Sequence, residues 1–493
     1  MKLKVRDIQL TTGGPLVAVL HEKTAKALGI FPTDRVHIRR LQKKEGANCV
    51  INITKKGVKE DEIGLFEEVL KKVKVSHGTH VEVEQAEHPL SIQFIKKKLE
   101  GKELTELELD TIVKDIVANE LSETELTYFV SGCYSHGLSI KETVFLTNAI
   151  VKNGEQLHFK KGEIVLDKHC SGGVPGNRTT MIVIPIIASL GYKIPKTSSR
   201  AITSPSGTAD TFEVLAPVTL NKKKIEAVVK KTNACIVWGG GVDLASADDK
   251  MIKIRHPLSI DPTGMLLASI MAKKKAAGAT HVLIDIPWGK NVKIETKKQA
   301  KLLRKGFLKV GRLLGLKIKV ILTDGSQPIG NGIGPALEAT DVISVLKCNG
   351  PNDLRQKAIF MATEALKLVG EKDPEKKVLQ ALESGKAYKK FKDIIYAQGG
   401  LKHPNIPKAQ LFYTVDAKQE GKIKEINNKK IALIATLAGA PEEKTAGVYL
   451  RVRVGRWVRK GEILFTIYAN TKQNLDTVKK QLKELDPIVY EQV

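Results

Sequence analysis

Short runs of alternating apolar and polar residues open the chain and predict β-strands. They include the segments KLKVRDI, LVAVL, VHIRR and CVINITKKG, which are separated by glycine, proline and aspartate. Two short helical segments, EKTAKALG and IGLFEEVLKKV, interrupt the strands. We therefore predict a small β-rich domain with its own core over residues 1–85.

The apolar spacing becomes helical between residues 86 and 160. Apolar residues recur every three or four positions in IQFIKKKLEG, TELELDTIVKDIVAN, SETELTYFVSGCYSHG and SIKETVFLTNAIVKNG. The order SETE before an apolar run is that of a helix capping box. We predict an α-helical domain here.

Strands and helices alternate between residues 161 and 405. The predicted strands are GEIVLD, ACIVW, THVLIDI and KIKVILTD, and the helices between them include RTTMIVIPIIASLG and TGMLLASIMAKKKAAG. This order is typical of an α/β domain with a mostly parallel sheet, which binds ligands at the carboxyl ends of its strands. Residues 406–493 return to alternation, which predicts a C-terminal α+β sandwich domain and a multidomain α/β chain.

Composition narrows the class of partner. The formal net charge is +26, but the lysines occur in short, scattered runs and aromatic residues make up only 5% of the chain. This pattern favours a solvated lysine-rich surface and a small anionic substrate over nucleic acid. Five isolated cysteines without a CxxC pair favour a reducing cytoplasm over a zinc site or disulfides, and we expect no signal peptide or membrane span.

The segment DKHCSGGVPGN is the first candidate site. Lys168 follows a predicted strand, three glycines expose the backbone, and Thr179 and Thr180 open the next helix. Backbone N–H groups, a lysine and a helix N-terminus together favour a phosphate. The motif is neither a Walker A loop nor GxGxxG. The alternative is a tight strand–helix turn with an incidental lysine.

A hydroxyl-rich segment, KTSSRAITSPSGTADTFE, is the second candidate. Arg200 offers a planar fork to an anion and the surrounding hydroxyls can bind its other oxygens; the alternative is an ordinary Ser/Thr-rich loop. The position of Asp261 before Pro262 and a predicted helix favours the role of a helix N-cap, when spacing alone is considered. Lys293, taken alone, would be predicted to be a surface lysine.

Several of these segments resemble one known family. DKHCSGGV, PKTSSRAITSPSGTAD, LASIMAKKKAAGA and GIGPALEA follow the order and spacing of the thymidine/pyrimidine-nucleoside phosphorylase family, from about residue 89 to the end. The β-rich N-terminal extension and the versions SSRAIT and SIDP are most similar to the archaeal AMP-phosphorylase branch.

The resemblance implies a reaction and a set of residues. AMP and phosphate would give adenine and ribose 1,5-bisphosphate, with CMP and UMP as further candidate substrates. Asp261 would donate a proton to the leaving base. The residues expected to bind phosphate are Lys168, Thr179 and Ser198, and those expected to bind nucleotide are Gly173, Ser199, Arg200, Ala201, Ile202, Thr203, Ser204, Thr208, Ser269 and Lys293.

The resemblance implies no metal or organic cofactor, since inorganic phosphate is a co-substrate, and it implies a homo-oligomer, a dimer or larger. Two alternatives stay open at this point. One is a thymidine or pyrimidine-nucleoside phosphorylase that does not need a 5′-phosphate. The other is a basic RNA-binding protein on a phosphorylase fold, which clustered surface arginines and aromatic residues would support.

Overall fold

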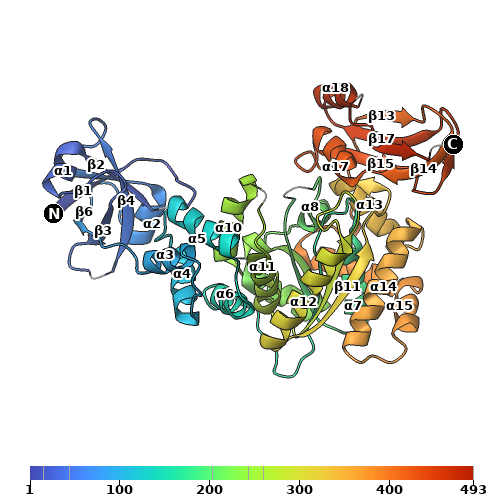
Figure 1. Cartoon of the computed structure of the whole chain (residues 1–493), viewed down its shortest axis with the longest axis horizontal. Coiled ribbons are helices and arrows are strands. Elements are labelled where there is room, and N and C mark those ends of the chain that lie inside the picture. The colour runs from blue at the N-terminus through green and yellow to red at the C-terminus, as the bar shows by residue number, and fades with distance from the viewer. Residues whose placement is uncertain are drawn as a thin grey trace. The chain divides into compact units, whose positions relative to one another are not determined.

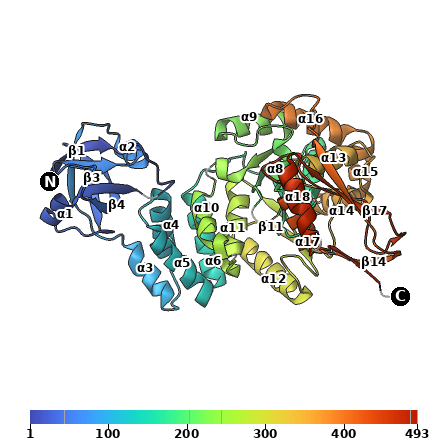
Figure 2. The same cartoon turned by 90° about the horizontal axis from the view of Figure 1, so that it is seen from above.

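A computed structural model describes residues 1–14, 16–43, 45–201, 204–242, 244–258, 260–482 and 484–491 (Figures 1 and 2). The chain forms two compact units. Residues 1–153 and 246–268 form the first, and residues 154–245 and 269–493 form the second. Helix α11 (Thr263–Ala276) belongs to both.

The first unit begins with a closed six-stranded barrel. Its strands follow the order β1-β5-β2-β4-β3-β6, with parallel pairs β1–β5 and β2–β4. The bounds are β1 (Lys2–Asp7), β2 (Val17–His21), β3 (Arg35–Arg40), β4 (Gly46–Thr54), β5 (Glu62–Leu65) and β6 (His80–Gln85), with α1 (Glu22–Ala27) and α2 (Glu67–Val73). The prediction of a helix from Ile63 was wrong, because this segment enters the barrel as β5 and the helix begins at Glu67.

Helices complete the first unit. They are α3 (Ser91–Leu99), α4 (Glu106–Ala118), α5 (Glu123–His136), α6 (Ile140–Lys152) and α10 (Ser246–Arg255), followed by the short 3₁₀ helix η2 (His256–Leu258). The capping box predicted from SETE is present: Ser122 accepts from the backbone N–H of Glu125, whose side chain accepts from Ser122. A buried ion pair, 2.8 Å between Lys98 Nζ and Glu142 Oε1, ties α3 to α6.

A parallel sheet forms the centre of the second unit. Strands β11 (Lys317–Asp324), β10 (His281–Trp288) and β7 (Leu166–Cys170) are parallel, as are β8 (Ile194–Ser198) and β9 (Ala234–Trp238). A parallel bridge between Val165 and Lys193 connects β7 to β8. All five strands therefore present their carboxyl ends at one edge of the sheet. Strand β8 had not been predicted, because IPKTS contains a proline and a lysine and lacks an apolar run.

Helices surround this sheet. They are α7 (Thr179–Ser189), α8 (Thr208–Glu213), α9 (Lys222–Thr232), α12 (Lys297–Leu313), α13 (Pro335–Leu346), α14 (Asn352–Leu368), α15 (Pro374–Glu383) and α16 (Lys386–Gln398), with the 3₁₀ helix η1 (Gly239–Gly241) and the later part of α11. Helix α7 is apolar on all sides because it is the central helix of the core, where α14, α15 and α16 pack against it.

Two small sheets and two helices follow. One sheet has the order β12-β15-β17-β13 and the other β16-β14-β18. The bounds are β12 (Gly332–Ile333), β13 (Leu411–Asp416), β14 (Gly421–Ile426), β15 (Gly447–Leu450), β16 (Trp457–Val458), β17 (Ile463–Ala469) and β18 (Ile488–Tyr490), with α17 (Asn428–Leu437) and α18 (Lys472–Gln481). The predicted fold class is thus confirmed, whereas the four exact domain boundaries stay predictions. Within the described ranges, no helix combines the length and the hydropathy that crossing a bilayer requires.

Candidate functional site

The glycine loop joins β7 to α7 at the carboxyl edge of the parallel sheet. Gly173 and Gly176 have φ values of +93° and +72°, which favour glycine. A Cβ atom on Gly173 would lie 2.7 Å from the backbone N of Lys293, and one on Gly176 would lie 2.2 Å from the carbonyl oxygen of Ile329. The loop therefore needs glycine twice, for its backbone conformation and for its close packing against the loops after β10 and β11.

Lys168 lies in the middle of β7 and not at its end, because the strand continues to Cys170. Its side chain is 1% exposed, and its Nζ donates to Thr180 Oγ1 at 3.3 Å in the first turn of α7. Burial lowers the pKa of Lys168, and Asp285 opposes that shift. The buried ammonium group thus faces the N-terminus of the helix that follows the glycine loop, which suits an anion.

Asp285, on β10, is the carboxylate nearest to this lysine. Its Oδ2 lies 4.0 Å from Lys168 Nζ and 3.2 Å from Lys357 Nζ of α14. Thr323 of β11 donates to its Oδ1 at 2.6 Å, and Lys357 also donates to Thr323 at 3.1 Å. None of Asp285, Thr323 and Lys357 was predicted from the sequence, because they lie on separate elements without a local motif.

Hydroxyl groups without hydrogen-bond partners gather at the ends of β7 and β8. Ser171 Oγ, Thr197 Oγ1 and Ser198 Oγ are buried, and none has a partner among the residues that the structure describes. A buried hydroxyl without a partner is costly unless a ligand satisfies it. Since β7 and β8 are neighbouring parallel strands, Ser171, Ser198 and the Lys168 ammonium can serve one anion at the same edge, whereas Thr197, which is adjacent to Ser198 on β8, points to the other face of the sheet. Ser198 was among the residues predicted to bind phosphate.

Thr179 and Cys170 make contacts within the glycine loop. Thr179 donates to Asn177 Oδ1 at 2.6 Å, and Asn177 Nδ2 contacts Cys170 Sγ at 3.5 Å. Of the two threonines that open α7, it is Thr180 that contacts Lys168. The role predicted for Thr179 at the anion stays a prediction, and Thr180 joins the candidate residues. Burial raises the pKa of the Cys170 thiol, which keeps it protonated and a weak donor.

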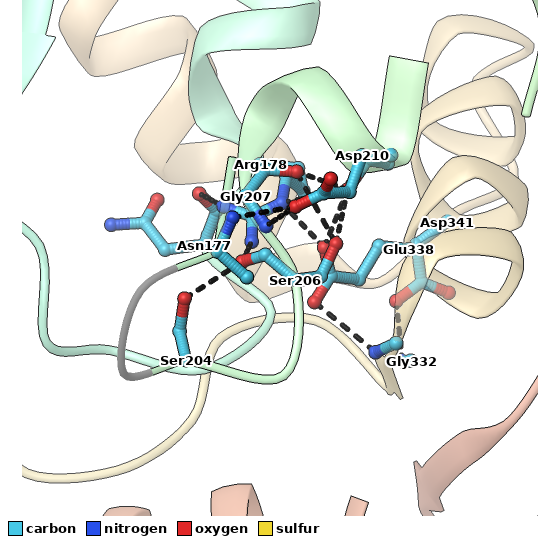
Figure 3. Close-up of polar contacts among 12 residues, drawn as sticks. Asn177, Arg178, Ser204, Ser206, Gly207, Asp210, Gly332, Glu338 and Asp341 are labelled. Carbon is cyan, nitrogen blue, oxygen red and sulfur yellow. Dashed lines mark hydrogen bonds and ion pairs between the residues drawn. The ribbon is translucent and has the colours of Figure 1, made fainter. Parts of the chain in front are cut away.

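Arg178 joins the glycine loop to the hydroxyl-rich loop and to α13 (Figure 3). Its guanidinium donates to Glu338, to the carbonyl oxygen of Ser206, to that of Asn177 at 3.1 Å and to Thr211 Oγ1 at 3.0 Å. The Glu338 carboxylate is fully buried, and burial raises its pKa against the influence of Arg178. This network fixes the two loops that carry the candidate ligands relative to each other.

Arg200 is held by carboxylates. Its two terminal nitrogens donate to Glu213 at 2.8 and 2.7 Å, and one of them also to Asp210 at 3.2 Å. Its guanidinium carbon lies 4.9 Å from the centre of the Trp238 ring. A 5′-phosphate would therefore have to share Arg200 with Glu213, so the binding role predicted for this arginine stays a prediction.

The remaining residues of the hydroxyl-rich loop lie around this arginine. The backbone N–H of Ala201 donates to Asp210 at 2.6 Å, and Ser204 Oγ donates to the carbonyl oxygen of Ser206 at 2.9 Å. Thr208 is the first residue of α8, and Ser199 lies between the last residue of β8 and Arg200. Ile202 and Thr203, both predicted to bind nucleotide, lie outside the described residues.

Asp261, Ser269 and Lys293 complete the predicted residues. Asp261 belongs to the first unit and precedes α11; its Oδ1 lies 3.5 Å from Arg255 NH1, and its side chain is 37% exposed. Ser269 is buried on α11, in the part of that helix that belongs to the second unit. Lys293 follows β10, where its backbone contacts Gly173. Within the described ranges, no group of three or more His, Cys, Asp or Glu side chains is placed to hold a metal ion.

Comparison with known proteins explains this combination of elements. Residues 92–154 match the helical bundle domain of a glycosyl transferase family, residues 162–388 match its a/b domain, and residues 422–488 match the pyrimidine nucleoside phosphorylase C-terminal domain. An AMP phosphorylase of Thermofilum pendens is 42% identical over 492 residues, which cover 99% of this chain and 95% of the relative. The chain belongs to the AMP phosphorylase family.

The family also includes proteins named after a related activity. A Legionella pneumophila relative with a provisional thymidine phosphorylase name is 42% identical over 459 residues, covering 91% of this chain and 88% of the relative. The fold extends further, to anthranilate phosphoribosyltransferase of Thermus thermophilus, with a TM-score of 0.51, 15% identity and coverage of 62% of this chain and 98% of that one. The predicted family membership is confirmed.

Proposed function

We propose that this member of the AMP phosphorylase family cleaves nucleoside 5′-monophosphates by phosphorolysis, converting AMP and phosphate into adenine and ribose 1,5-bisphosphate. Full-length relatives named AMP phosphorylase support this reaction. The structural observation that carries the proposal is the buried Lys168 ammonium beside the N-terminus of α7, with the unsatisfied hydroxyls of Ser171 and Ser198 at the same sheet edge.

The phosphate would bind at the end of β7. Lys168 would supply the charge, Thr180 and Ser198 would donate hydrogen bonds, and the loop and helix N–H groups would bind the remaining oxygens. These groups would hold one phosphate oxygen in line with C1′ of the ribose while the bond to the base breaks. Positioning and electrostatic stabilisation would therefore supply most of the acceleration.

Asp261 would donate a proton to the departing base. The electrons of the C1′–N bond leave with the base, and a proton on its ring nitrogen makes it a better leaving group. Arg255, 3.5 Å from the Asp261 carboxylate, would orient this group. Ser269 and Lys293, with Gly173, would hold the nucleotide. The reaction needs no cofactor besides inorganic phosphate as co-substrate.

A second candidate is phosphorolysis of thymidine or pyrimidine nucleosides. Two observations favour it: the Legionella relative carries that name, and the Arg200 guanidinium is already held by Glu213 and Asp210. The predicted homo-oligomer and cytoplasmic location stay predictions under either function.

Product analysis tests the proposed function. The purified protein, incubated with AMP and phosphate, is expected to release adenine and to form a sugar carrying two phosphate groups, which ³¹P NMR detects. Omitting phosphate should stop the reaction. Adenine released at the same rate without phosphate would show a hydrolase, and no release from any nucleotide or nucleoside would refute the proposal.

A further inference from the structure

Three charged side chains, two of them buried and one largely buried, lie together on one face of the parallel sheet, beside the groups proposed to bind phosphate. Strands β7 and β10 pair with Cys170 opposite Asp285. Lys168 lies two residues before Cys170 on β7, so its side chain points to the same face of the sheet as that of Asp285. Lys357 reaches the same face from α14. The exposed side-chain fractions are 1% for Lys168, 0% for Asp285 and 10% for Lys357, so water screens these charges poorly. Together they carry one excess positive charge.

The two lysines do not share Asp285 equally. Lys357 Nζ lies 3.2 Å from Asp285 Oδ2, whereas Lys168 Nζ lies 4.0 Å from the same oxygen. Thr323 donates to the other oxygen of Asp285 and accepts from Lys357, which closes a small ring of contacts. Lys168 instead donates to Thr180, on the side of the glycine loop and the N-terminus of α7.

A second buried carboxylate of the same sheet offers a comparison. Asp167, the residue before Lys168 on β7, accepts from Lys196 at 3.1 Å and from Lys274 at 2.7 Å, so both lysines are bound to one carboxylate. That arrangement uses both ammonium groups. Around Asp285, in contrast, Lys357 lies at ion-pair distance from Oδ2, an oxygen with no hydrogen-bond partner among the described residues, and Lys168 lies farther from the same oxygen.

We propose that Lys357 is a positioning residue for the phosphate site: it occupies Asp285 and so leaves the Lys168 ammonium available to the attacking phosphate. The inference rests on the proposed function. If Lys357 lost its charge, Asp285 would be a buried carboxylate with Lys168 as its nearest cation. The two would then form a closed pair, because an uncompensated buried charge is costly. The excess positive charge of the group would be lost, and a dianion would bind weakly.

Phosphate binding by variants of Lys357 tests this. In Lys357→Met, the dissociation constant of inorganic phosphate, measured by titration calorimetry, and the KM for phosphate should both rise at least about tenfold. The KM for AMP should change much less. Lys357→Arg keeps the charge and should retain affinity for phosphate. Lys367→Met is the matched control: this lysine lies on the same helix, is 52% exposed and pairs with Glu364 instead.

Removing Asp285 as well should rescue the first variant. In Lys357→Met/Asp285→Asn no carboxylate is left to capture Lys168, so phosphate affinity should recover most of the loss. Asp285→Asn alone should bind phosphate as tightly as the wild type or more tightly, and this variant decides the matter if Lys357→Met does not fold.

Three results would overturn the inference: Lys357→Met with wild-type phosphate affinity, equal increases of both KM values, or an Asp285→Asn variant that binds phosphate about tenfold more weakly. A wild-type protein that neither binds phosphate nor releases base in its presence would refute the proposed function itself. The two failures are thus distinguishable.

Discussion

Lys168 is proposed to bind the attacking phosphate, and the sequence predicts that Arg200 binds the 5′-phosphate of the nucleotide, so single substitutions can separate the two roles. Lys168→Ala should raise the KM for inorganic phosphate more than the KM for AMP, because the attacking phosphate loses its buried cation. Arg200→Ala should show the opposite bias. Each charged hydrogen bond contributes about 1.5–3 kcal/mol, so at least about a tenfold effect is expected on the affected KM. Proportional increases of both KM values in both variants would mean that the two residues serve one anion.

Asp261 is proposed to act as the general acid, and asparagine cannot replace it because an amide does not donate the required proton. Asp261→Asn should keep affinity for AMP and lose about 10²- to 10⁴-fold in kcat. Asp248→Asn is a control for the charge around Arg255, since Asp248 Oδ1 lies 3.6 Å from the same guanidinium. If Asp261→Asn turned over at nearly the wild-type rate, this aspartate would have only a structural role beside Arg255, one residue before the N-cap position of α11.

At the residue scale, the sequence singled out those candidate ligands that lie in one continuous segment. Lys168 and Ser198 stand beside glycines and hydroxyls, and their residue types already favour an anion. Asp285 and Lys357 could not be found, because a buried aspartate inside THVLIDI and a lysine inside a helix look like ordinary residues. They can be recognised as part of the candidate site only in the folded protein, where β10 and α14 place them near Lys168.

The glycine loop is the element whose backbone should matter most. Gly172 and Gly173 both have positive φ values, +88° and +93°, but a Cβ on Gly172 meets no atom within 4 Å, whereas one on Gly173 meets Lys293 at 2.7 Å. Gly172→Ala should therefore cost only backbone strain, on the order of 1 kcal/mol of unfolding free energy. Gly173→Ala should also displace the loop and raise the KM for phosphate. Equal KM values for both variants would contradict this tight packing.

The pair formed by Arg200 and Glu213 makes the stability of α8 and its loop depend on pH. The hydrogen bond from Arg200 lowers the pKa of Glu213 from 4.5 to about 2. A carboxylate whose pKa is lower in the folded state stabilises the protein at pH values above its ordinary pKa. This stabilisation is lost as the pH falls toward 2. Glu213→Gln should thus be less stable than the wild type at pH 7, with a difference that shrinks below about pH 4.5.

Denaturant unfolding at several pH values measures this difference. Glu226→Gln, an exposed glutamate on α9, is the control and should not change the pH dependence. A Glu213→Gln variant whose deficit stays constant down to the lowest pH at which the protein folds would show that the ion pairs of Glu213 with Arg200 and Lys444 contribute nothing.

Elements with a clear apolar period were predictable, and those formed by tertiary packing were not. Strands β9, β10 and β11 and helix α7 were predicted from their apolar runs. Strand β8 was missed because its burial depends on β7 and β9, and β5 was mistaken for part of α2 because closure of the barrel decides the conformation of that segment. The end of β7 was placed too early, since Lys168 and His169 are polar residues inside a strand.

At the scale of the whole molecule, the order of β-rich, helical, α/β and β-rich segments predicted the fold class because each has its own hydrophobic period. The strongly basic charge remains largely that of lysines on the surface, together with three buried lysines near the sheet, Lys168, Lys196 and Lys274, and the largely buried Lys357. Buried cations in excess of aspartates suit an anionic substrate. The same charge does not identify which nucleotide or nucleoside is cleaved.

Substrate preference tests the central claim most directly. The measurement is kcat/KM for phosphate-dependent base release from AMP, CMP, UMP, adenosine and thymidine under identical conditions. A requirement for the 5′-phosphate predicts that AMP exceeds adenosine and thymidine by at least about tenfold, the contribution of one charged hydrogen bond. Equal values for AMP and thymidine, or a preference for thymidine, would contradict the assignment of a nucleoside 5′-monophosphate as the substrate.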